Sequence, residues 1–140
     1  METYLEFAKL LDELLAGARA VHITVPGYMP LSIEEIGSSD EGYRLVSLCQ
    51  YGEQNGDLMR DPDMVFLFHN LPCGAAAEPV SFRNDYLGIS QEVYRYDETG
   101  RRTHVFLTLK QDLKTFATTW FAVLRDQGFC SAPLKSSHLG

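Results

Sequence analysis

The apolar positions near the two ends of the chain repeat with the period of an α-helix. In residues 3–16 and in residues 108–127, apolar side chains recur every three or four positions. Each segment starts with the spacing of a capping box, formed by Thr3 and Glu6 in the first segment and by Thr108 and Gln111 in the second. Gly17 and Gly128 follow the segments at the points where the helices could end. We therefore predict an N-terminal helix and a longer C-terminal helix.

The middle of the chain shows the apolar and polar alternation of β-strands. We predict strands near residues 21–25, 31–36, 43–51, 64–68, 80–82, 87–96 and 103–107. The segments 43–51 and 64–68 are apolar in both alternation phases, so we expect them to be central neighbours with cover on each face. Residues 70–79 show no periodicity and are predicted to form a loop.

The strands at 43–51 and 64–68 flank a stretch rich in turn residues. Asn55-Gly56 favours a type I′ turn because both residues tolerate positive φ angles, which predicts a hairpin that passes through Glu53 and Leu58. Pro62 cannot donate a ladder hydrogen bond, so Asp61-Pro62-Asp63 is expected to interrupt the pairing.

The order of these elements predicts an α+β fold. Consecutive strands with short connections favour an antiparallel meander of six or seven strands, with the N-terminal and C-terminal helices packed on the sheet. With 140 residues, the chain has the size of one domain, which we place at residues 1–130. Residues 131–140 are short and polar and are predicted to be a flexible tail.

Charge and cysteine content restrict the function further. The formal net charge of −7 argues against non-specific nucleic-acid binding, which requires a basic face. The three cysteines form no Cys-x-x-Cys pair, and Cys49 lies in an apolar strand, so reduced thiols in a cytoplasmic protein are expected. The N-terminus lacks the basic region of a signal peptide, and no apolar run approaches the ~18 residues of a membrane span.

Candidate chemistry is concentrated in the acidic hairpin 53–63. The carboxylates of this hairpin are Glu53, Asp57, Asp61 and Asp63. Together with Asp85 and Glu92, they could bind a divalent cation or act as a general acid and base. The same residue types are also the usual turn formers, because they hydrogen-bond their own backbone. The sequence has no nucleophile elbow, phosphate loop or dinucleotide fingerprint, so no cofactor is expected.

A second group of polar residues lies in the next predicted turn. Arg83 and Asp85 flank it, and Tyr86 is the aromatic residue that we most expect to be an exposed contact, because aromatic and arginine side chains anchor interfaces. None of the four histidines lies within four positions of another, so the sequence gives no histidine metal motif.

Three motifs resemble those of an uncharacterised bacterial family. The segment Glu53-Gln54-Asn55-Gly56-Asp57-Leu58-Met59-x-Asp61-Pro62-x-Met64 is similar to its signature. Arg83-Asn84-Asp85-Tyr86-Leu87-Gly88 with Gln91-Glu92-Val93-Tyr94 resembles a second motif, and the segment from Asp112 to Phe129 resembles its closing helix. The resemblance implies a domain of unknown function from gut-type bacteria and their mobile elements, without an activity or ligand.

The leading hypothesis is a non-catalytic binding or accessory module with a protein partner. Its contact residues would be Glu53, Asn55, Asp57, Asp61, Arg83, Asp85 and Tyr86, and a homo-oligomer is compatible with the sequence. One alternative is a divalent-metal-dependent hydrolase with Glu53, Asp57, Asp61 and Asp85 as ligands. The other is an acidic inhibitor or DNA mimic, which the net charge of −7 permits.

Overall fold

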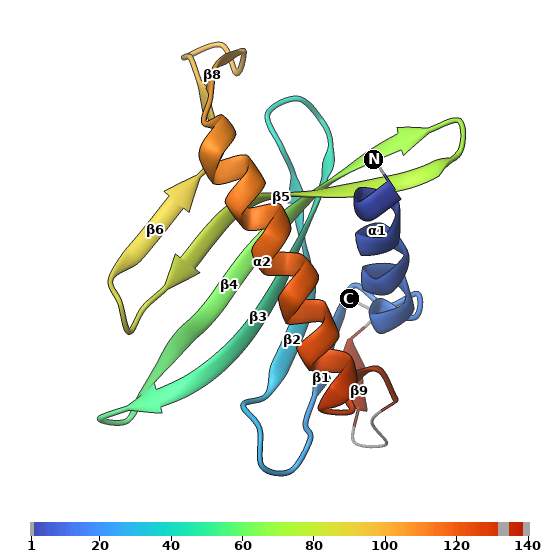
Figure 1. The fold of residues 1–140 in the computed structure, drawn as a ribbon, viewed down its shortest axis with the longest axis vertical. Helices are drawn as coiled ribbons and strands as arrows, with labels where there is room; N and C mark the ends of the chain where they lie inside the picture. Colours follow the sequence, from blue (N-terminus) through green and yellow to red (C-terminus); the bar gives the residue numbers. More distant parts are fainter. Residues whose placement is uncertain (1, 132–134, 139–140) are drawn as a thin grey trace.

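The computed structural model describes residues 2–131 and 135–138 (Figure 1). Its elements are, in order, α1 (Glu2–Leu15), β1 (Ala20–Ile23), β2 (Leu31–Ser38), β3 (Arg44–Gln54), β4 (Asp57–Leu71), β5 (Gly74–Asn84), β6 (Ile89–Glu92), β7 (Tyr94–Tyr96), β8 (Arg102–Val105), α2 (Leu107–Asp126), the 3-10 turn η1 (Phe129–Ser131) and β9 (Lys135–His138).

The main sheet has the strand order β6-β5-β4-β3-β2-β1-β9, and all neighbours are antiparallel. Strands β1 to β6 follow one another in sequence, so the predicted α+β fold with an antiparallel meander is confirmed. The strands β7 and β8 form a separate two-stranded hairpin. The predicted tail contains β9, which pairs with β1, and residues 132–134 and 139–140 lie outside the described residues.

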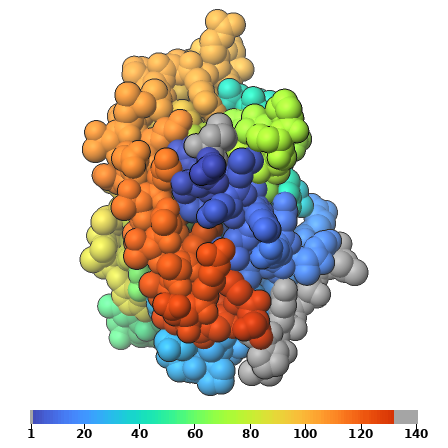
Figure 2. All heavy atoms as spheres, turned by 45° about the vertical axis from the view of Figure 1, so that its right-hand side comes forward, coloured from blue at the N-terminus to red at the C-terminus, as the bar shows by residue number. Residues whose placement is uncertain are grey.

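Both helices lie on the same face of the main sheet. The ring of Phe66 from β4 lies 5.9 Å from that of Phe7 in α1 and 5.6 Å from that of Phe121 in α2. Phe7 and Phe121 also contact each other edge to face, with centroids 5.0 Å apart. Figure 2 shows the two helices side by side over this face. The hydrophobic core therefore lies between the helices and one side of the sheet.

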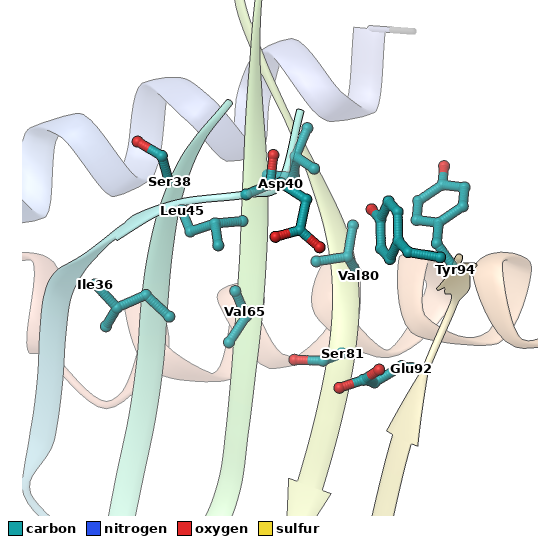
Figure 3. Close-up of a pocket in the computed structure, with 12 residues that line it drawn as sticks. Ile36, Ser38, Asp40, Leu45, Val65, Val80, Ser81, Glu92 and Tyr94 are labelled. Carbon is teal, nitrogen blue, oxygen red and sulfur yellow. The ribbon is translucent and has the colours of Figure 1, made fainter. Parts of the chain in front are cut away.

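In the described part of the chain, no helix lies over the other face of the sheet. Leu45 pairs with Leu67 in the register of β3 and β4, and the alternation of a strand places both opposite the face of Val46 and Phe66. Figure 3 shows Leu45 and Val65 on the near side of the strands, with both helices behind them. We expected elements packed on each face of the central strands. On this side, the β2–β3 turn and the β7–β8 hairpin are the segments among the described residues that lie over the sheet.

The loop prediction for residues 70–79 is wrong. β4 continues to Leu71 and β5 starts at Gly74, with Phe68 paired to Ala77 and His69 to Ala76. The alanines gave no alternation signal, but α1 packs over β5, where small side chains allow a helix to approach the strand closely.

Two further boundaries differ from the prediction. The single strand expected at 87–96 is divided at Val93, whose buried side chain joins the core while its backbone N–H donates to the Val80 carbonyl. α2 begins at Leu107 after an N-cap at Phe106 that makes no side-chain hydrogen bond. The predicted capping box at Thr108 is therefore absent, because Thr108 already lies inside the helix.

The hairpin between β3 and β4 forms as the sequence predicts. Asn55 and Gly56 have φ angles of 54° and 86°, and Glu53 pairs with Leu58. The ladder is interrupted between the pairs Cys49–Asp63 and Tyr51–Arg60, at the position of Pro62. This irregularity bends the hairpin next to the following turn of the sheet.

Candidate functional site at the hairpin end of the sheet

Three connections meet at one end of the main sheet, because antiparallel neighbours turn at alternate ends. They are the loop at residues 24–30, the turn at residues 55–56 and the turn at residues 85–88, and Figure 1 shows them together in the lower part of the view. We call these connections and the residues that flank them the hairpin end. Both sequence motifs contribute to it.

Asp85 joins the two motifs. Its Oδ2 accepts a hydrogen bond from the Arg60 backbone N–H at 2.9 Å, and its Oδ1 accepts one from the Arg83 Nε at 3.0 Å. The Asp85 backbone N–H in turn donates to the Arg60 carbonyl at 2.9 Å. The Arg60 amide, and after it the guanidinium groups of Arg83 and Arg60, hold the pKa of Asp85 below its usual value. Asp85 is therefore a carboxylate whose oxygens are occupied within the chain.

Asn84 makes a second connection between the motifs. Its side-chain nitrogen donates to Asp61 Oδ1 at 2.7 Å, and its side-chain oxygen accepts from the Leu87 backbone N–H at 3.1 Å. Asn84 is buried, so these bonds replace contacts with water. We call the residues Arg60, Asp61, Arg83, Asn84 and Asp85 the Asp85 cluster.

Tyr86 lies against the β3–β4 hairpin. A Cβ atom built at Gly52 would overlap with the Tyr86 hydroxyl and would lie about 3 Å from two ring carbons, so glycine is required for this approach. The Tyr86 side chain is 41% exposed, and its ring covers the β3 backbone while the rest faces solvent.

The predicted binding residues thus fall into two groups. Asp61, Arg83 and Asp85 are brought together in the Asp85 cluster, next to Tyr86. The remaining three lie at the exposed tip of the hairpin: Glu53, Asn55 and Asp57. Asn55 has a left-handed backbone and forms the turn itself.

The loop at residues 24–30 is anchored to the core through Gln50. Trp120 Nε1 of α2 donates to Gln50 Oε1 at 3.0 Å, and Gln50 Nε2 donates to the Met29 carbonyl at 3.2 Å. Gln50 is buried with both polar atoms of its amide satisfied. The loop is thereby held beside the β3–β4 hairpin.

Between this loop and the hairpin lies a groove of about 760 Å³ with a largely apolar lining. Its walls include Tyr28, Met29, Pro30, Tyr51 and Leu58. Leu58, which lines the groove, is 72% exposed, and Leu87 in the turn at residues 85–88 is 69% exposed. Such concentrations of exposed apolar side chains mark interaction surfaces in proteins.

Tyr51 lines this groove and Cys49 precedes it by two positions in β3, but neither supplies a reactive anion. Burial raises the pKa of the Cys49 thiol to about 12. Burial, followed by the neighbouring Cys49, raises the pKa of Tyr51 to about 12. The interpretation of Cys49 as a small buried hydrophobic residue is confirmed, because its side chain is 1% exposed.

The acidic residues of the hairpin do not converge into a metal site. Among the side chains of residues 2–131, no group of three or more His, Cys, Asp and Glu residues could hold a metal ion. Asp61 and Asp85 are bound by Asn84, Arg60 and Arg83, as described above.

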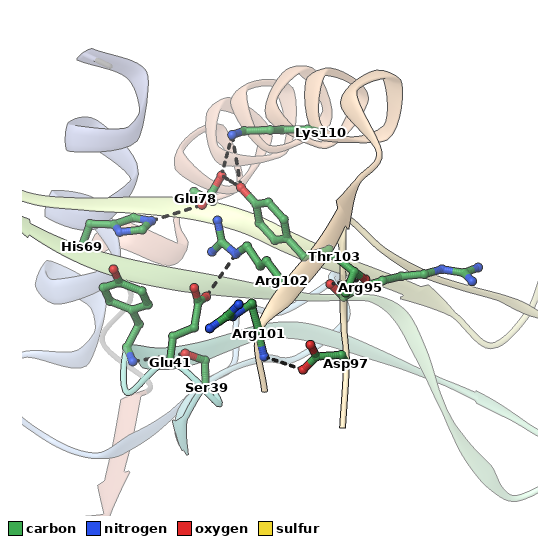
Figure 4. Close-up of polar contacts among 12 residues, drawn as sticks. Ser39, Glu41, His69, Glu78, Arg95, Asp97, Arg101, Arg102, Thr103 and Lys110 are labelled. Atoms are coloured by element: carbon green, nitrogen blue, oxygen red, sulfur yellow. Dashed lines mark hydrogen bonds and ion pairs between the residues drawn. The ribbon is translucent and has the colours of Figure 1, made fainter. Parts of the chain in front are cut away.

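Sequence reasoning missed a second polar cluster around Glu78. This carboxylate accepts hydrogen bonds from Tyr94 Oη at 2.6 Å and from His69 Nε2 at 3.1 Å, and it pairs with Lys110 Nζ at 3.1 Å (Figure 4). The Glu78 residue is 4% exposed. We call His69, Glu78, Tyr94 and Lys110 the Glu78 cluster, which connects β4, β5, β7 and α2.

Hydrogen bonding decides the charge of Glu78. Burial alone raises the pKa of this carboxyl group, but hydrogen bonds from Tyr94, His69 and Lys110 outweigh the effect and lower it below the usual value. The pKa of Tyr94 is raised by burial and by the Glu78 carboxylate. The cluster therefore contains an ionised Glu78 beside a neutral Tyr94. The sequence signal was the single charged residue between Gly74 and Phe82, within a segment predicted to be a loop.

Comparison with known protein families adds one finding. A family model described as a domain of unknown function, DUF6908, matches residues 2–130. The chain belongs to this family. The expectation of an uncharacterised family is confirmed, and the DUF6908 match extends from α1 to η1. No curated protein and no solved structure gives a significant match. In the described part of the chain, no helix is long and apolar enough to cross a bilayer.

Proposed function

We propose that this DUF6908 domain is a non-catalytic binding module that contacts a protein partner through its hairpin end. One observation carries the proposal: the two sequence motifs are hydrogen-bonded to each other through Asp85, while Leu58, Tyr86 and Leu87 remain exposed beside them. The polar residues of the motifs thus hold the surface in shape, and the apolar residues are free to make contacts.

The Asp85 cluster supports this function by fixing the surface before binding. The Asn84–Asp61 contact and the two hydrogen bonds between Arg60 and Asp85 hold the turn at residues 85–88 against β4. A surface that is ordered in the free protein loses less conformational entropy when a partner binds. The hydrogen bond from Gln50 to the Met29 carbonyl orders the loop at residues 24–30 in the same way, so this loop also loses less conformational entropy on binding.

The chemistry of the hairpin end indicates the chemistry of its partner. Leu58 and Leu87 supply apolar contacts, and Tyr28 extends them across the groove. Glu53 and Asp57 are exposed and form no ion pair within the described residues. The partner surface complementary to this arrangement is apolar at its centre and basic at its rim.

The proposal places the domain in the cytoplasm of a bacterial or mobile-element system. Its three cysteines are free thiols, as expected in a reducing compartment. The bacterial origin follows the resemblance of the three motifs described above. The acidic surface suits a protein partner better than a nucleic acid, whose phosphates would be repelled.

The test starts with a partner identified by cross-linking and then measures binding with the two purified proteins. The variant Glu53→Lys/Asp57→Lys is expected to lower the association rate at least about tenfold at low salt, because rim charges steer encounter. The variant Leu58→Ser/Leu87→Ser is expected to raise the dissociation rate about tenfold or more, because affinity differences within one interface lie mainly in dissociation.

The matched control is Glu13→Lys/Glu98→Lys, which makes the same change in net charge at exposed positions on α1 and on the β7–β8 hairpin. Rates within about twofold of the wild type are expected for this control, because its charges lie outside the proposed interface. If both charge variants change binding equally, net charge rather than the hairpin end determines the interaction. If neither hairpin-end variant changes it, the proposed surface is wrong.

A further inference from the structure

The sheet face without helices has its own hollow, separate from the hairpin end. The β2–β3 turn and the β7–β8 hairpin lie over this face, where Arg102 Nε of β8 is 3.1 Å from Glu41 Oε1. At Gly100 an added Cβ would lie 3.2 Å from the Asp40 Cβ, so the two turns are in close contact. Figure 4 shows Arg102 and Glu41 facing each other between these segments.

A cavity of about 400 Å³ lies between these turns and the sheet. Leu45, Val65, Leu67 and Val80 form its apolar floor. This volume falls within the range of ~300–1,000 Å³ that is typical of small-molecule sites.

Two carboxylates at the cavity have no internal cation. Asp40 comes from the β2–β3 turn and Glu92 from the end of β6, and Figure 3 shows them at different sides of the hollow. Neither forms an ion pair with a side chain of residues 2–131. No Lys, Arg or His is among the described residues that line the cavity. The cavity therefore combines an apolar floor with uncompensated negative charge.

Tyr94, which lines one side of the cavity, belongs to the Glu78 cluster. The Tyr94 hydroxyl donates to Glu78 and accepts from Lys110 Nζ at 3.2 Å, which fixes the ring that lines the cavity. The Arg102 guanidinium lies 3.7 Å from the Tyr94 ring centroid, and its charge is met by Glu41. Tyr96 adds a second aromatic ring to the lining. Aromatic rings next to carboxylates favour cations over anions.

We propose that this cavity binds a small organic ammonium ion, with its apolar body on Leu45, Val65 and Leu67 and its charged group between Asp40 and Glu92. A hydrocarbon ligand would leave the two carboxylates unused, and an organic anion would be repelled by both. The proposal is independent of the protein-binding function, because its residues lie outside the hairpin end.

Three probes of similar size test the ligand class: 2-phenylethylamine, 2-phenylethanol and 3-phenylpropionate. Binding is followed by amide chemical shifts in titrations of the full chain, so that the site of contact is observed directly. The amine is expected to shift the resonances of Leu45, Val65 and Ser81 and to bind at least about tenfold more tightly than the alcohol, because a charge-assisted contact is added. No saturable shift is expected with the carboxylate.

The variant Asp40→Asn/Glu92→Gln is expected to reduce the affinity for the amine about tenfold and to leave that for the alcohol unchanged, since only the charge is removed. The control Glu53→Gln/Asp57→Asn removes the same charge at the hairpin end and is expected to leave amine binding unchanged. Equal affinity for all three probes would overturn the cationic class. The absence of shifts at Leu45 and Val65 with every probe would overturn the site itself.

Discussion

The Glu78 cluster and the Asp85 cluster both join segments that are distant in sequence, but their surroundings differ. Glu78 is buried and receives three donors from β4, β7 and α2. Asp85 lies near the surface, where its partners Arg60 and Arg83 are themselves partly exposed. A buried charge loses its hydration and depends fully on internal partners, whereas an exposed charge can exchange them for water. The comparison separates a cluster that stabilises the fold from one that shapes a surface.

The largest effect is expected when the buried carboxylate is removed. Glu78→Ala leaves Tyr94, His69 and Lys110 without their acceptor and should lower the free energy of unfolding by about 3 kcal/mol. Glu78→Gln retains one acceptor oxygen and should lose less than Glu78→Ala. Urea denaturation measures both variants. A loss below about 1 kcal/mol for Glu78→Ala would mean that the Glu78 cluster contributes no more to stability than exposed ion pairs do.

A smaller effect is expected where Tyr86 crosses the hairpin. Gly52→Ala forces the Tyr86 ring away from β3 and should lower the unfolding free energy by about 1.5 kcal/mol, within the range for overpacking. In a Tyr86→Ala background the same substitution should cost less than about 0.5 kcal/mol, because the overlapping group is gone. The double-mutant cycle is measured by urea denaturation. Equal costs in both backgrounds would show that the ring does not lie on Gly52.

At the Asp85 cluster we expect a loss of about 1 kcal/mol for Asp85→Asn, because charged hydrogen bonds are weakened at a partly exposed site. The difference between variant and wild type should shrink at about 1 M NaCl, where exposed charges are screened. Glu78→Gln serves as the buried comparison and should change little with salt. Identical salt responses would remove the distinction between the two clusters.

The smallest effect that we predict concerns pH. The folded pKa of Glu78 is below its ordinary value of 4.5, so its contribution is present above pH 4.5 and is lost as the pH falls through the lowered folded pKa. The folded pKa of Asp85 is likewise below its ordinary value of 3.8, so its contribution to stability is also lost as the pH falls. The wild type should therefore lose more stability than Glu78→Gln when the pH falls from about 5 to about 3. If the unfolding free energies of the wild type and Glu78→Gln change in parallel between about pH 5 and about pH 3, Glu78 does not have a lowered pKa in the folded protein.

The sequence was sufficient for the parts of the fold that local patterns determine. The two helices follow from their apolar spacing, and the β3–β4 turn follows from Asn55-Gly56, whose positive φ angles the structure shows. The interruption of the ladder at Pro62 follows from its missing N–H. These features depend on neighbouring residues along the chain, so one sequence is enough to predict them.

The parts that were missed depend on contacts between distant residues. Ala76 and Ala77 belong to β5 because the register with His69 and Phe68 places them under α1, which no alternation pattern signals. The Glu78 cluster needs the same register together with the position of α2. The convergence of the two motifs at Asp85 similarly follows from strand pairing. Sequence patterns identified candidate residues in the two motifs but none in the loop at residues 24–30, and the fold shows which of the candidates are bound internally and which are exposed.

The central claim is that the hairpin end contacts a partner, and cross-linking from two positions tests it most directly. Leu58 and Leu107 are 72% and 70% exposed, so a photo-reactive phenylalanine analogue at either position should leave the fold intact. The account predicts a specific adduct from position 58 that disappears in the Glu53→Lys/Asp57→Lys background, and none from position 107, in cells that encode the protein. Equal adducts from both positions, or an adduct from position 107 alone, would contradict it.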